Sequence, residues 1–232
     1  MCWLCGAMGW CLPASCGITS VAALLAELLG SSFSTLRQQL REWCYDAKDK
    51  KGEHRQEVDI TLCFGPLLRW ILSLWPLQEC RLALVMDATT LSDRFTVLSI
   101  SVVYRGCAIP VAWKMLRGGE KGSWQPYWKE LLTSLQGSVP KHWTVIVLAD
   151  RGLYAPWLFH HIVALGWHPF LRINLGGKVR PVGADKFDWL AKLVPHTGSA
   201  WCGVVDCGCR RAPCAVPFWH AGMKTTPTRG WC

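Results

Sequence analysis

The spacing of hydrophobic residues changes near residue 80, from the period of a helix to the short apolar runs of buried strands. Two leucine stripes with helical spacing come first: Leu24, Leu25, Leu28 and Leu29, and then Leu36 and Leu40. A further helix is predicted over 63–75 and should end at Pro76. We therefore expect residues 1–80 to form a helical N-terminal region.

Beyond residue 80, five apolar or β-branched runs predict strands at 82–86, 95–104, 108–115, 143–149 and 168–173. Helical spacing over 124–135 and 155–165 separates the later strands. Short connections predict an antiparallel meander of the first three strands, and right-handed crossovers set the fourth strand parallel to the first and the fifth beside the fourth. The expected fold class is α/β, a ribonuclease H-like mixed sheet of three antiparallel and two parallel strands.

Two of these strands run directly into an aspartate, Asp87 after the first strand and Asp150 after the fourth. Neighbouring parallel strands would bring the two carboxylates together, where their mutual repulsion is relieved by a cation. Hard oxygen ligands suit magnesium or manganese, and two such ions can support in-line phosphodiester displacement. The alternative is that each aspartate only caps the segment after its strand.

Composition supports a folded, basic protein. Hydrophobic residues make up 51% of the 232 residues and charged residues 18%, and neither figure suggests intrinsic disorder. The formal net charge of +9 makes a polyanion the first partner to consider, although an ordinary basic enzyme would have the same charge. The mixed charges of residues 41–57 predict a solvated loop, with contact to DNA phosphate as the alternative.

The sequence contains no apolar run of the length that a membrane helix needs, and its first 16 residues lack the basic residues of a secretory signal. We therefore expect a cytoplasmic protein without a membrane partner. Thirteen cysteines cluster toward both ends. Cys2-x-x-Cys5 and Cys207-x-Cys209 have the spacing of zinc half-sites, but no second pair follows either, so reduced thiols are the preferred interpretation.

Three segments resemble a known family: LVMDATT at 84–90, YRGCAIPVAW at 104–113 and VLADRG at 147–152. They are similar to bacterial DDE transposases of the insertion-sequence-four type, and the resemblance covers about 36–196. It implies an enzyme that cuts and rejoins double-stranded DNA at transposon ends, with a homodimer and nucleoid association as further expectations. Asp87 and Asp150 would be the first two ligands of a two-ion magnesium or manganese site. Arg151 and Tyr154 would lie near the DNA.

The family's third metal ligand, a glutamate on a later helix, has no counterpart. The last glutamate is Glu130, and only Asp185, Asp188 and Asp206 follow. We therefore expect a C-terminally truncated transposase with impaired activity. Its expected organisation is a helical region at 1–80, a partial catalytic core at 81–200, and an irregular Cys-rich tail at 201–232 that could be out of frame.

Three other interpretations remain open. The first is a DNA-binding remnant without catalysis, supported by the basic residues of the C-terminal part: Lys178, Arg180, Lys186, Lys192, Arg210, Arg211, Lys224 and Arg229. The second is a ribonuclease H-like nuclease that cuts without joining. The third is a vestigial reading frame whose product folds poorly, because its fifteen tryptophans would expose apolar surface.

Overall fold

The computed structural model describes residues 17–50, 57, 59–76, 78–119, 124–172, 177–193, 200–207 and 214–221. The chain divides into two compact units, residues 1–60 and residues 61–232. None of the helices in the described ranges is long and apolar enough to span a membrane.

The first unit contains a pair of helices, α2 (Ile18–Leu29) and α3 (Phe33–Trp43), followed by the short 3-10 helix η1 (Ala47–Asp49). Its core consists of five buried side chains: Val21, Ala22, Leu25, Leu36 and Leu40. Leu36 and Leu40, the two leucines expected on the apolar face of α3, are both buried.

The expected stripe on α2 is only partly correct. Leu25 is buried, but Leu28 and Leu29 are 60% and 45% exposed. These two leucines lie in the last turn of α2, next to the left-handed Gly30 (φ 60°) where the chain turns toward α3. Val21 and Ala22, one turn earlier, take their place in the core because they lie on the side of α2 that α3 covers.

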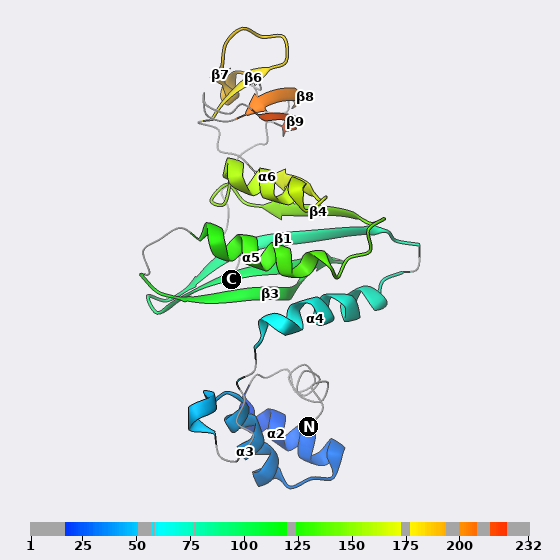
Figure 1. Ribbon diagram of the computed structural model, residues 1–232, viewed down its shortest axis with the longest axis vertical. Helices are drawn as coiled ribbons and strands as arrows, with labels where there is room; N and C mark the ends of the chain where they lie inside the picture. Colours follow the sequence, from blue (N-terminus) through cyan, green and yellow to red (C-terminus); the bar gives the residue numbers. More distant parts are fainter. Residues whose placement is uncertain are drawn as a thin grey trace. The chain divides into compact units, whose positions relative to one another are not determined.

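The second unit is built on a five-stranded sheet (Figure 1). Its strands are β1 (Arg81–Leu91), β2 (Phe95–Tyr104), β3 (Cys107–Arg117), β4 (Thr144–Ala149) and β5 (His168–Leu171). The spatial order is β3-β2-β1-β4-β5, in which β1, β2 and β3 pair antiparallel and β4 and β5 are added parallel to β1. The fold is ribonuclease H-like. The sequence-based prediction of three antiparallel and two parallel strands is confirmed.

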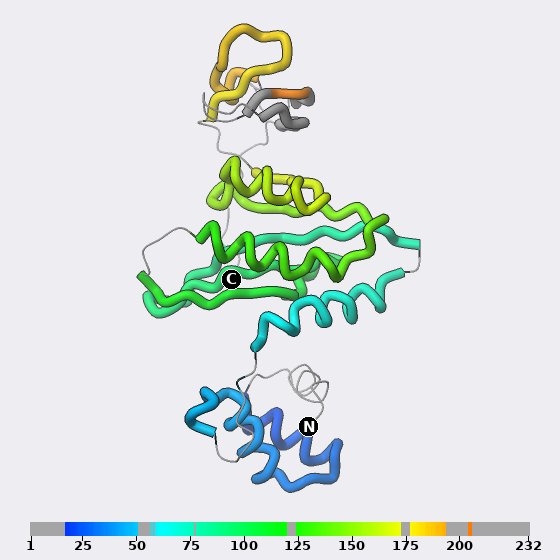
Figure 2. Tube along the Cα trace, viewed as in Figure 1, coloured from blue at the N-terminus to red at the C-terminus, as the bar shows by residue number. Residues whose placement is uncertain are grey.

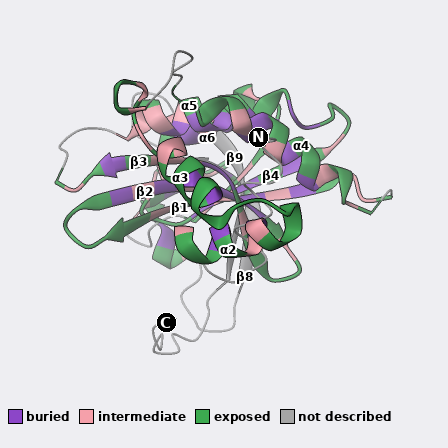
Figure 3. Ribbon diagram, turned by 90° about the horizontal axis from the view of Figure 1, so that it is seen from below, coloured by how far each residue is buried: buried purple, intermediate pink, exposed green. Residues whose placement is uncertain are grey.

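Two crossover helices bury one face of this sheet. Helix α5 (Gln125–Gln136) connects β3 to β4, and α6 (Pro156–Ala164) connects β4 to β5. On β1 every second side chain, Leu82, Leu84 and Met86, is buried in the core that these helices share with the sheet. Figure 3 shows buried positions on α5 and on strand β2. The intervening β1 residues point to the other face, because side chains alternate along a strand.

Helix α4 (Thr61–Ser73) belongs to this second unit, and Figure 2 shows the chain leading from it into β1. Phe64, Leu68 and Ile71 are buried in the same core as the sheet. At Gly65 the helix approaches α5 so closely that an added Cβ would lie 2.7 Å from Oγ of Ser138. The boundary between the two units, expected after residue 80, lies after residue 60. The reason is that α5 and β3 bury the apolar face of α4.

A second, four-stranded antiparallel sheet follows, with the order β7-β6-β8-β9. It contains β6 (Lys178–Pro181), β7 (Asp188–Trp189), β8 (Ala200–Cys207) and β9 (Cys214–Ala221), with the 3-10 helix η2 (Leu190–Lys192) after β7. The expectation of an irregular segment from residue 201 is therefore wrong for 201–207 and 214–221. Pro217 lies in β9, the edge strand, where a residue that cannot donate a hydrogen bond is tolerated.

The position of α4 in the core can be tested with two substitutions on the same helix. Leu68→Ala removes a side chain that is 0% exposed, and we expect it to lower the free energy of unfolding by about 2–5 kcal/mol. Leu62→Ala removes a side chain that is 73% exposed and should change it by less than about 0.5 kcal/mol. Urea unfolding followed by circular dichroism measures both values. Equal effects of the two substitutions would contradict the packing of α4.

Candidate functional site

The parallel pairing of β1 with β4 makes Asp87 and Asp150 neighbours. The last paired residues of the two strands are Met86 and Ala149, so the two aspartates are the next residues in the same register. Adjacent strands lie about 4.8 Å apart. Both aspartates are exposed. The structure therefore brings together the two carboxylates that the sequence singled out.

Asp87 lies inside its strand, which corrects the expectation that the strand ends there. β1 continues to Leu91 and pairs with β2 over this stretch, from Asp87 opposite Ser99 to Leu91 opposite Phe95. Only the parallel pairing stops at this point, because β4 ends at Ala149. The backbone of Asp87 is thus part of the β1–β2 ladder.

Hydroxyl groups hold Asp87 from its own strand and from β2. Thr89 Oγ1 donates a hydrogen bond to Oδ2 of Asp87 at 2.7 Å, and Ser99 Oγ donates to the Asp87 carbonyl oxygen at 3.4 Å. Residues two apart on a strand point to the same face, so Thr89 is placed to make this contact by the strand geometry itself. The hydrogen bond restricts the carboxylate and leaves Oδ1 available.

Asp150 is held by a backbone donor and faces a cation that the sequence did not reveal. The N–H of Arg151 donates to Oδ1 of Asp150 at 2.6 Å. The guanidinium of Arg172 lies 3.7 Å from the same oxygen. Arg172 directly follows β5, and its N–H donates to the Ala149 carbonyl at 2.9 Å, which continues the β4–β5 register. The sequence places Arg172 in the predicted fifth strand, but only the register of β4 and β5 sets it beside Asp150.

The two residues expected near DNA take different positions. The side chain of Arg151 is exposed in the turn after Asp150, whereas Tyr154 is half-buried just before α6. The turn is closed by hydrogen bonds from the Leu153 and Tyr154 N–H groups to the Asp150 and Arg151 carbonyls. A role in DNA binding stays a prediction for both residues.

The donor set of Asp87 and Asp150 fits a hard divalent cation such as Mg²⁺ or Mn²⁺, because carboxylate oxygens are the ligands such ions prefer. Arg172 would compete with the ion for Asp150. Both side chains of that ion pair are largely exposed, at 74% and 66%, so the pair contributes little and can open. Among the described residues no group of three His, Cys, Asp or Glu side chains could hold a metal ion. Two carboxylates with water are enough for one ion.

The remaining candidates for a third carboxylate do not complete the pair. Glu130 on α5 and Asp185 after β6 form no group with Asp87 and Asp150 among the described residues. Asp188 is engaged by Lys192, whose Nζ lies 2.9 Å from its Oδ1. Hydrogen bonds from Lys192 and from the Trp189 N–H keep the pKa of Asp188 below its usual range. The side chain of Asp206 lies outside the described residues.

The suggested zinc half-sites gain no structural support. The backbone of Cys207 ends β8, while Cys2, Cys5 and Cys209 lie outside the described residues. Within the described part, Cys44, Cys63, Cys80 and Cys107 form no disulfide.

Comparison with known proteins finds similarity only at the level of structure. No protein-family model and no curated protein sequence matches the chain. The solved structures similar to it include the catalytic domain of Mos1 mariner transposase, with 15% identity, a TM-score of 0.28, and coverage of 51% of this chain and 63% of that chain. A structure of the Mos1 transposase catalytic domain and raltegravir with Mn has 15% identity and a TM-score of 0.28, and the match covers 52% of this chain and 62% of that chain.

The Mos1 strand transfer complex gives 15% identity, a TM-score of 0.26, and coverage of 72% of this chain and 56% of that chain. The chain thus matches about three fifths of the length of these transposases. Superpositions this weak add nothing to the fold, which rests on the strand order and register.

The competition between Arg172 and a cation can be tested directly. Arg172→Gln should raise the Mn²⁺ affinity about two- to fivefold, since an exposed ion pair contributes up to about 1 kcal/mol. Asp150→Asn should weaken binding instead, because it removes a ligand charge. Isothermal titration with Mn²⁺ measures both. Arg117→Gln, at the end of β3, removes the same charge from an exposed position away from the pair. An equal gain in both arginine variants would show only a general charge effect.

Proposed function

We propose that this chain is the catalytic-core part of a DDE-type DNA transposase of the bacterial insertion-sequence-four kind. The observation that carries the proposal is the register of β1 and β4, which makes Asp87 and Asp150 neighbours on an α/β sheet. The DATT, YRGCAIPVAW and ADRG segments and the net charge of +9 support it from the sequence. Its partner is double-stranded DNA at the ends of a mobile element, in the nucleoid, and its functional form is a homodimer.

In this proposal Asp87 and Asp150 hold a magnesium or manganese ion. Such an ion, when bound, supplies Lewis-acid polarisation of the scissile phosphate and of the attacking oxygen. Thr89 restricts Asp87 through its hydrogen bond, and the Arg151 N–H does the same for Asp150. Arg172 is placed to exchange its ion pair with Asp150 for a DNA phosphate, to which a guanidinium can donate two hydrogen bonds.

Two carboxylates leave the site short of the ligands that two ions require. The described residues contain no third carboxylate grouped with the pair. We therefore propose that the described core binds DNA and one divalent ion but does not join DNA ends efficiently by itself.

A non-catalytic DNA-binding role is the second candidate, and the β6–β7 hairpin favours it. Lys178 is paired with Trp189 across the hairpin, with its Nζ 4.5 Å from the indole centroid. Arg180, on the same side of β6, lies 5.1 Å from the ring of Phe187. Cations alternating with aromatic rings suit the phosphates and bases of nucleic acid. This candidate needs no metal ion.

The proposal is tested by measuring binding and joining separately. We expect the chain to bind duplex DNA without metal, with an affinity that falls more than about tenfold between about 50 and 200 mM salt. With Mg²⁺ or Mn²⁺ and a plasmid carrying the DNA that flanks its own gene, joined products should stay at the level of the Asp87→Ala variant. Fluorescence anisotropy and gel analysis of the plasmid provide the two measurements.

Asp93→Ala serves as the matched control, since it removes a carboxylate from the turn between β1 and β2, away from the pair. Joined products that disappear in Asp87→Ala but persist in Asp93→Ala would mean that the site is complete. Nicking without joining that is lost in Asp87→Ala would favour a ribonuclease H-like nuclease. Absence of salt-dependent duplex binding would overturn the transposase proposal and its DNA-binding alternative together.

A further inference from the structure

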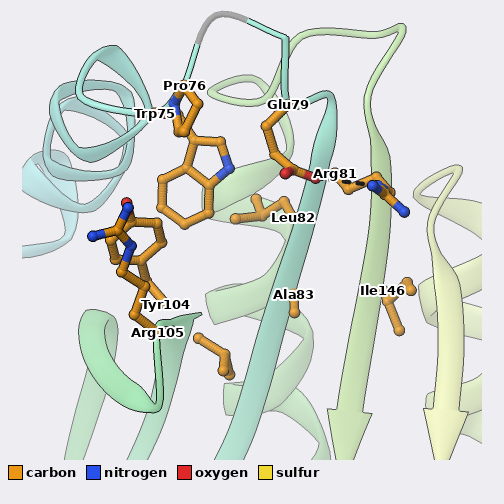
Figure 4. Close-up of a pocket in the computed structure, with 10 residues that line it drawn as sticks. Trp75, Pro76, Glu79, Arg81, Leu82, Ala83, Tyr104, Arg105 and Ile146 are labelled. Atoms are coloured by element: carbon orange, nitrogen blue, oxygen red, sulfur yellow. Dashed lines mark hydrogen bonds and ion pairs between the residues drawn. The ribbon is translucent and has the colours of Figure 1, made fainter.

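A pocket of about 440 Å³ lies where β1 and β2 separate, at the end of the sheet opposite Asp87 (Figure 4). The β1–β2 ladder begins only at Leu84 opposite Val102, so the first residues of β1 are not paired with β2. Ala83, Val103 and Ile146 supply apolar surface. A volume of this size suits a small organic ligand.

The rim of the pocket combines aromatic rings with charges. The rings of Trp75 and Tyr104 lie 4.7 Å apart, and the guanidinium of Arg105 lies 5.2 Å from the Tyr104 centroid. Across the pocket Arg81 Nε donates to Glu79 Oε1 at 3.1 Å. Figure 4 shows Trp75 between these two charged sides. An apolar interior with guanidinium groups on its rim suits a flat ring that carries an anionic group.

Arg105 occupies a backbone conformation that its residue type disfavours. It has φ 48° and Gly106 has φ 83°, in the two-residue turn between β2 and β3. Turns with two positive φ values prefer Asn, Asp or Gly at the first position. Ser92 also has a positive φ, but its hydroxyl bonds to the Leu91 carbonyl of its own hairpin at 2.6 Å. Arg105 lies at a strained position from which its guanidinium reaches the pocket, and such strain clusters at functional sites.

The strand register connects this pocket with the aspartate pair. Ala83 lies opposite Ile146, Val85 lies opposite Leu148, and Asp87 and Asp150 come next on the same side of β1 and β4. Arg81 and Asp87 are six residues apart on β1, which corresponds to about 20 Å. That distance is about six nucleotides of a stacked strand.

We propose that the pocket binds one unstacked nucleotide of a single DNA strand that continues along this side of the sheet toward Asp87 and Asp150. The base lies against Trp75 and the apolar residues, and Arg105 contacts a phosphate. Glu79 and Arg81 offer an acceptor and donors to the edge of the base. The inference rests on the proposed function for the identity of the ligand as DNA.

The test is binding of a labelled ten-nucleotide single strand, measured by fluorescence anisotropy without metal. Arg105→Asn should weaken binding by about tenfold or more, the effect of losing a charge-assisted hydrogen bond to a phosphate. Its melting temperature should stay equal or rise, because Asn tolerates the positive φ better than Arg. Lys141→Asn removes the same charge from the exposed segment before β4, outside the pocket, and should weaken binding less than about twofold.

Equal losses in the two variants would overturn the proposal, since they would reflect charge alone. An unchanged affinity of Arg105→Asn would overturn it as well. The same titrations with a duplex separate this inference from the proposed function. Duplex binding that persists while single-strand binding is absent overturns only the pocket, whereas loss of both overturns the transposase proposal too.

Discussion

The parallel pairing of β1 with β4 is the constraint on which the rest of the second unit depends. It joins two segments separated by the whole of β2, β3 and α5, and it sets the register that makes Asp87 and Asp150 neighbours. A shift by one residue would turn the buried side chains of β4 to the opposite face. Val145 and Val147 are 1% and 0% exposed, so such a shift would remove them from the core. Burial on one face thereby fixes the position of the carboxylates at the end of the pairing.

The chemistry of the site follows from where this pairing stops. Because β4 ends while β1 continues along β2, Asp87 has a strand on one side and Asp150 begins a turn. Two like charges held close are unfavourable unless a cation is present. Arg172, carried to the same edge by β5, partly supplies that cation. In the proposed function a metal ion replaces this counterion at Asp150, and Arg172 then pairs with a DNA phosphate.

The two ends of the sheet have different chemical character. The end with Asp87 and Asp150 presents carboxylates and one guanidinium, whereas the opposite end presents rings, an apolar pocket and the strained Arg105. In our two proposals DNA binds at both ends: its phosphates lie at the first end, through a cation, and one base lies in the pocket at the second end. One side of β1 and β4 connects them.

The sequence by itself determined the five strands of the first sheet, their order and the placing of Asp87 and Asp150 on adjacent parallel strands. Apolar runs mark buried strands directly, and short connections with right-handed crossovers permit few other arrangements. It could not determine that α4 joins the second unit, because an apolar helix face does not reveal what covers it. The strands β6 to β9 were not predicted, and in β8 and β9 Cys, Pro and Gly obscure the alternation. Arg172 and the pocket were decided only by the tertiary structure, because both depend on register between strands distant in sequence.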